Sequence, residues 1–189
     1  MRKFLLWALA FAFALALEAH VSPTVVLVRR GDFMKDSLSG ASKFFEKTLS
    51  APAIVAVRAD TGWTPSGEDA KVYVGREGSG RIIGSVVFLW IPSQHGPLSL
   101  GVAFSPDGKI RRATVLEVCT EPLAWVRPLL VDGSLSGVEG LALSQSPDPS
   151  RIGPSTAGAM SRYYAKVIAE GIARAQSVDK SSVAAEKGS

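Results

Sequence analysis

The sequence predicts an α+β domain: a twisted antiparallel sheet of two hairpins, with helices on one side and a long C-terminal helix. Two pairs of runs rich in valine and isoleucine are each joined by a glycine-containing turn, which is the pattern of β-hairpins. Residues 157–175 then repeat apolar side chains at helical spacing. With 189 residues, 47% hydrophobic and 20% charged, the chain is long enough for one folded domain.

The amino-terminal residues have the pattern of a targeting segment. Arg2 and Lys3 precede an uncharged apolar run over residues 4–17, and small residues follow up to Ala19. This run is too short for a typical span of ~30 Å of hydrocarbon. We therefore expect residues 1–19 to be a signal peptide and the mature protein to be secreted or periplasmic. The alternative is an uncleaved segment that anchors the domain to the membrane.

The next part of the chain predicts short helices. Residues 32–45 carry apolar side chains near the helical period but contain a Ser-Gly pair, so we expect a short helix followed by a turn. A second short helix is expected over residues 51–60, ended by Gly62. The composition of residues 63–69 indicates a loop.

Two hairpins follow. Residues 71–76 and 81–90 are joined by Glu-Gly-Ser-Gly, and residues 98–104 and 110–118 by Ser-Pro-Asp-Gly. The glycines of the first turn do not form a dinucleotide-binding loop, because the chain continues as a strand instead of a helix.

The strand over residues 98–104 has two unlike faces. Bulky side chains alternate with small ones: Leu98, Leu100, Val102 and Phe104 on one face, and Ser99, Gly101 and Ala103 on the other. We expect the bulky face in the core. The small face leaves room either for a closely packed helix or for a flat ligand ring.

The last third of the sequence predicts two helices and a long connection. Residues 121–131 have helical spacing that a proline interrupts, and residues 132–151 are rich in Ser, Gly and Pro. Residues 157–175 form the clearest amphipathic helix. Residues 177–189 lose this periodicity, so we expect a disordered tail and a domain over residues 20–176.

Composition excludes several classes of function. The single cysteine, Cys119, can form neither an internal disulfide nor a thiolate metal site, and we expect it to be partly buried and inert. Basic residues are scattered and the net charge is only +4, so no nucleic-acid partner is expected. Neither a phosphate-binding loop motif nor a conventional acid–base or nucleophilic constellation is present.

One segment has the pattern of an anion site. Gly153, Ser155 and Thr156 lead from the long connection into the strongest helix, with both hydroxyls at its expected N-cap. Free backbone N–H groups and the helix dipole favour a phosphate at such a position. The alternative is an ordinary hydroxyl cap, which contributes ~1 kcal/mol to helix stability.

Several motifs, taken in order, resemble one known family. His95-Gly96-Pro97-Leu98 opens a strand, Ser-Pro-Asp-Gly-Lys-Ile forms the following turn, and Val-Leu-Glu closes the next strand. Together with the targeting segment and the C-terminal helix, this order resembles the FMN-binding domain family. That domain occurs in extracytoplasmic flavoprotein subunits of the Rnf and Nqr ion-pumping complexes. The resemblance runs from about residue 32 to residue 175.

The resemblance implies a set of cofactor-binding residues. Thr156 falls on the threonine that accepts FMN through a phosphodiester bond made by a separate flavin transferase. Gly153 and Ser155 precede it, where this sequence departs from the family's Ser-Gly-Ala-Thr. Thr120 and Glu121 fall near the family's acidic-threonine-proline motif with the first two residues exchanged. His95 completes the set through the His-Gly-Pro match.

The implied function is an extracytoplasmic FMN-binding electron-transfer protein. It would be an electron carrier more than a stand-alone enzyme, and its redox partner would be a protein in the membrane or the periplasm. Such a domain supplies binding and orientation while the flavin supplies the redox chemistry. The altered motif before Thr156 leaves open a flavin-free relative that acts as a binding or assembly module. A role in flavin delivery or sensing is a third option.

Overall fold

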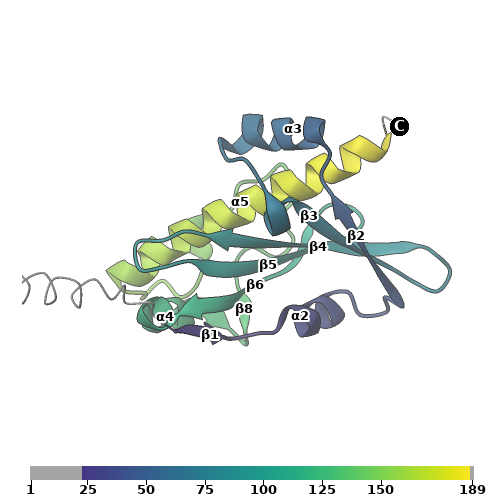
Figure 1. Cartoon of the computed structure of the whole chain (residues 1–189). Coiled ribbons are helices and arrows are strands. Elements are labelled where there is room, and N and C mark those ends of the chain that lie inside the picture. Colours follow the sequence, from purple (N-terminus) through teal and green to yellow (C-terminus); the bar gives the residue numbers. More distant parts are fainter. Residues whose placement is uncertain (1–22, 188–189) are drawn as a thin grey trace, which may run out of the picture.

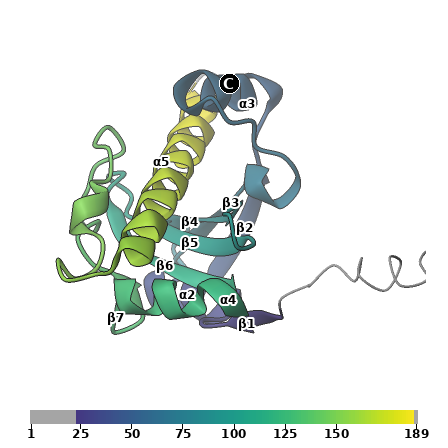
Figure 2. The same cartoon turned by 90° about the vertical axis from the view of Figure 1, so that its left-hand side faces the viewer.

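A computed structural model describes residues 23–187 and has the predicted α+β architecture (Figures 1 and 2). Its antiparallel sheet has six strands in the order β1-β6-β5-β4-β3-β2. The strands are β1 (Thr24–Val26), β2 (Lys43–Thr48), β3 (Lys71–Arg76), β4 (Ile82–Ile91), β5 (Leu98–Phe104) and β6 (Ile110–Cys119). The predicted signal peptide lies outside the described residues.

Both predicted hairpins are confirmed. β3 pairs with β4 and β5 with β6, and the β4–β5 pairing joins the two hairpins into one sheet. Two short strands complete the sheet at its edges, β1 beside β6 and β2 beside β3. The helical interpretation of residues 32–45 is wrong at its end, because Phe44 and Phe45 lie in β2. Pairing with β3 outweighs the helical spacing that includes Phe44.

One face of the sheet is covered by α5 (Ala159–Lys187), and α3 (Ala51–Thr61) packs against α5, as Figure 1 shows. The bulky face of β5 belongs to this core, as predicted, and Leu98, Leu100, Val102 and Phe104 are all fully buried. α5 approaches the sheet closely at Gly171, where a Cβ atom would stand 1.9 Å from Ile91 Cδ1. α3 ends at Gly62, which adopts the left-handed conformation at φ 69°.

The opposite face of the sheet is covered by α2 (Arg30–Ser37). The prediction that the helices lie on one side of the sheet is therefore wrong for this helix. Phe33 of α2 is fully buried. A Cβ atom at Gly101 would lie 2.9 Å from Phe33 Cε1. Of the two interpretations of the small face of β5, the closely packed helix is therefore the correct one.

The C-terminal helix is longer than predicted. The expected disordered tail over residues 177–189 is wrong as far as Lys187, where α5 ends. Val178 is fully buried and Asp179 is only 3% exposed. Small and polar side chains take over the buried face of the helix here, which is why the apolar periodicity fades although the packing continues.

The segment between β6 and α5 consists of short elements. α4 (Thr120–Val126) is followed by the 3-10 turn η2 (Arg127–Leu129), so the helix predicted over 121–131 ends near its proline. The long connection contains a small hairpin of β7 (Leu130–Val131) and β8 (Ser134–Leu135), then η3 (Pro149–Arg151). Another 3-10 turn, η1 (Gly67–Ala70), precedes β3. Among residues 23–187, no helix is long and apolar enough to cross a membrane.

Candidate functional site

Two of the predicted site residues meet in the folded chain. His95 lies in the loop between β4 and β5, and Glu121 lies in the first turn of α4. His95 Nδ1 is 2.9 Å from Glu121 Oε1, and the two side chains are 29% and 53% exposed. The contact engages Nδ1 and so fixes the orientation of the imidazole.

Aromatic side chains extend this contact toward the interior. The His95 ring lies 5.0 Å from the Trp125 ring of α4, and Trp125 stacks on Tyr164 of α5 at 6.0 Å. Tyr164 is fully buried, and burial raises the pKa of its hydroxyl. The cluster thus runs from a half-buried imidazole to a buried phenol, with the Trp125 ring between them.

The loop that carries His95 is held by short-range contacts. Ser93 Oγ donates to Gly96 O at 2.6 Å and lies 3.2 Å from the Tyr164 hydroxyl. Cys119 Sγ donates to Pro97 O at 3.7 Å, and a Cβ atom at Gly96 would stand 2.8 Å from that sulfur. Cys119 is buried, as predicted, and it packs beneath the loop.

The segment before α5 differs from the prediction. α5 begins at Ala159, so Ser155 and Thr156 do not occupy its N-cap, and the predicted capping geometry is wrong. Both residues are exposed in a turn that Ala157 N–H closes on Pro154 O at 3.0 Å. The turn forms because Gly153, at φ 77°, allows the chain to reverse there.

The predicted residues lie at the two ends of the segment formed by α4 and the turn η2. Thr120 is the first residue of α4, exposed beside Glu121, and its N–H donates to Pro23 O at 3.0 Å. Gly153 packs on Leu129 of η2, where its Cβ atom would stand 2.7 Å from Leu129 Cδ2. The His95 loop and the Gly153–Thr156 turn therefore flank one short continuous segment, residues 120–129.

Sequence reasoning missed the two aromatic residues of this site. Trp125 and Tyr164 stand at helical spacing in their segments, which is equally typical of core residues. The signal was the pair of adjacent aromatic residues, because Tyr163 and Tyr164 are the only aromatic residues between positions 157 and 187 of the sequence.

A second polar cluster lies near the end of α5, in the region predicted to be disordered. Asp179 is 3% exposed and accepts a hydrogen bond from Ser85 Oγ of β4. Burial raises the pKa of this carboxyl to about 6, against the lowering effects of Ser85 and of the positive charge of Lys47. The cluster borders a pocket of about 540 Å³.

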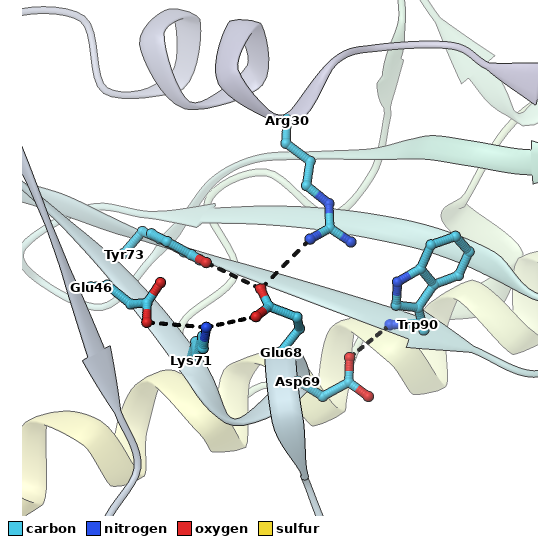
Figure 3. Close-up of polar contacts among 7 residues, drawn as sticks. All are labelled: Arg30, Glu46, Glu68, Asp69, Lys71, Tyr73 and Trp90. Carbon is cyan, nitrogen blue, oxygen red and sulfur yellow. Dashed lines mark hydrogen bonds and ion pairs between the residues drawn. The ribbon is translucent and has the colours of Figure 1, made fainter.

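A third polar network ties α2 to the edge of the sheet (Figure 3). Glu68 of η1 accepts a hydrogen bond from Lys71 at 2.6 Å and lies 3.9 Å from the Arg30 guanidinium. Lys71 also pairs with Glu46 of β2 at 3.1 Å. These groups pair with one another, so we interpret the network as structural.

Comparison with protein families and with curated proteins identifies no relative of this chain. The chain matches no model of a protein family, and no curated protein matches it. The two candidate sites, the His95 cluster and the Asp179 pocket, are therefore judged on their geometry.

Proposed function

We propose that the protein is an extracytoplasmic FMN-binding electron-transfer protein, with its flavin site where α4 meets the first turns of α5. The observation that carries the proposal is the contact between His95 and Glu121 at 2.9 Å, beside the Trp125 ring. These two residues were singled out by the family resemblance, and they lie far apart in the sequence.

The residues of this site fit a flavin. The imidazole of His95 is 29% exposed and is backed by the Trp125 ring, so it offers aromatic surface against which a planar ring can stack. The hydroxyls of Ser155 and Thr156 are exposed and can donate to a phosphate. When bound, the flavin would supply the electron-transfer chemistry, and the protein would supply its position and polarity.

A second candidate function is a flavin-free binding or assembly module of the same fold. One observation favours it: Phe33 of α2 occupies the small face of β5, which is therefore not a platform for a flavin ring. A redox partner protein and a flavin transferase are expected only for the first candidate function, the electron-transfer protein.

FMN affinity tests the proposal. The purified protein should bind added FMN, and Glu121→Gln should weaken binding about tenfold, because His95 loses the charged group that orients it. Glu77→Gln is the matched control. It removes a partly buried carboxylate paired with the exposed Arg81 in the turn between β3 and β4, at the other end of β4. Quenching of flavin fluorescence measures both affinities.

One outcome would contradict the flavin proposal and leave the binding module standing. It is a wild-type protein that stays colourless after co-expression with a flavin transferase and also fails to bind added FMN. Equal FMN affinity in Glu121→Gln, Glu77→Gln and wild type would instead show that FMN does not bind at His95.

The mode of attachment is tested at Thr156. We expect denatured protein to release its flavin, because the residues before Thr156 differ from the family's attachment motif at each position. Thr156→Ala should then weaken FMN binding by the loss of one hydrogen bond, ~1 kcal/mol, or up to ~3 kcal/mol for a bond to a charged phosphate. Mass spectrometry of the denatured wild type decides the question. A flavin adduct that Thr156→Ala removes and Thr156→Ser partly keeps would show covalent attachment.

A further inference from the structure

The pocket beside Asp179 lies at the opposite end of the sheet from His95. It is bounded by the last turns of α5, the beginning of β4 and the turn between β5 and β6, whereas His95 follows the end of β4. Its volume of about 540 Å³ lies within the range of roughly 300–1,000 Å³ that is typical of small-molecule sites.

The wall of this pocket is largely apolar. Val74, Ile82, Leu143 and Val183 line it. Two of them are unusually open for large hydrophobic side chains, since Ile82 is 37% exposed and Val183 45% exposed. A ligand with an apolar body would cover these surfaces and remove them from water.

The polar part of the pocket is dominated by a buried carboxylate. Asp179 accepts from Ser85 Oγ, and a carboxylate has room for further donors. The Lys47 ammonium donates to the backbone oxygen of Ser182 at 2.5 Å, so its protons are partly committed elsewhere. Lys180 and Asp107 are the other charged residues of the lining, and both are exposed.

We propose that this pocket binds a small amphipathic amine, with its apolar body along the Val74–Leu143–Val183 wall and its ammonium group on Asp179. Asp179 loses hydration when it is buried, and a cationic donor bound to it compensates for that loss. An anionic group would be repelled by the carboxylate. A neutral alcohol makes the hydrogen bond without the charge and binds more weakly. The site is separate from the proposed flavin site and does not depend on it.

Three probes of the same length test the proposal: hexylamine, hexan-1-ol and hexanoate. Resonances of Ser85 and Val183 in the isotopically labelled protein should shift on titration with hexylamine, with a dissociation constant of roughly millimolar order. Hexan-1-ol should bind about tenfold more weakly, and hexanoate should not bind. Equal binding of all three probes, or no binding of hexylamine in this range, would overturn the proposal.

Two variants locate the interaction. Asp179→Asn should abolish the preference for hexylamine over hexan-1-ol. Val183→Lys adds a further cation to the lining, beside Lys47 and Lys180, on an exposed helix position, and it should weaken hexylamine binding about tenfold without unfolding the protein. Val55→Lys, on the 67% exposed Val55 of α3, is the matched control and should change nothing.

FMN tests whether the amine pocket and the proposed flavin site are independent of each other. Saturating FMN should leave hexylamine binding unchanged, whether or not the protein binds flavin at the His95 site. Displacement of hexylamine by FMN, or unchanged hexylamine binding in Val183→Lys, would show that the assignment of the pocket is wrong.

Discussion

Replacing Phe33 by alanine should lower the free energy of unfolding by about 3–5 kcal/mol. Phe33 is fully buried and is the main side chain between α2 and the small face of β5. Its ring packs edge-on against Phe88 at 6.2 Å, and the Arg112 guanidinium lies 5.8 Å from its centre. Gly101 has no side chain with which to fill the resulting cavity. Urea denaturation followed by circular dichroism measures the loss.

Phe45→Ala is the matched control for this prediction. Phe45 is 48% exposed on the edge strand β2, where its ring faces Arg76 at 5.6 Å. Its removal should cost about 1 kcal/mol or less. A similar loss in both variants would mean that α2 does not form a packed layer on the sheet. Retention of full stability by Phe33→Ala would have the same meaning.

The hairpins were predictable because their information is local. Ser-Pro-Asp-Gly and Glu-Gly-Ser-Gly favour reversal of the chain whatever lies around them, and the flanking residues alternate or branch as strands do. The end of α3 is local in the same sense, because Gly62 at φ 69° stops the helix. Each of these features is decided within a few residues.

The edges of the sheet were not predictable in this way. Phe44 fits the helical spacing of the residues before it, and β2 forms because β3 offers it a partner. The same holds for α2, whose position on the far face depends on the fit of Phe33 to Gly101, a contact between residues far apart in the chain. Short amphipathic segments do not specify which face they cover.

The candidate sites show the same difference between features that the sequence reveals and features that appear only in the folded chain. His95 and Glu121 were named from the sequence as separate site residues and not as a contacting pair, whereas Trp125 was hidden among core-like positions. Asp179 was missed because residues 177–189 were interpreted as a tail. Its signal was present: Ile168, Ile172 and Ala175 are followed at helical spacing by Asp179 and Ser182, which places a carboxylate on a core face.

Asp179 also predicts how the stability of the protein depends on pH. Its pKa of about 6 in the folded protein lies above its ordinary value of 3.8, so the folded state holds the proton to higher pH than the unfolded state does. The stability associated with the protonated carboxyl is complete below 3.8 and is lost as the pH rises through about 6. At ~1.36 kcal/mol for each pKa unit, the loss amounts to about 3 kcal/mol.

The comparison of wild type with Asp179→Asn isolates this effect. Asparagine does not titrate, and the other charged groups of the pocket, Lys47, Lys180 and Asp107, are common to both proteins. Between about pH 3.5 and about pH 7.5, the unfolding free energy of wild type should therefore fall relative to that of Asp179→Asn by about 3 kcal/mol. Urea denaturation of both proteins across this range measures the difference.

Asp107→Asn is the control with the opposite sign. Asp107 is an exposed carboxylate of the same pocket, and its hydrogen bonds with Ser105 and Lys109 lower its pKa. Its contribution to stability is present above its ordinary pKa and is lost as the pH falls, so Asp107→Asn should lose stability relative to wild type at neutral pH. If the difference between wild type and Asp179→Asn does not change with pH, or changes in the Asp107 direction, Asp179 is not a desolvated carboxyl. A carboxylate with an ordinary pKa is ionised and hydrated, so an amine would gain less by binding to it.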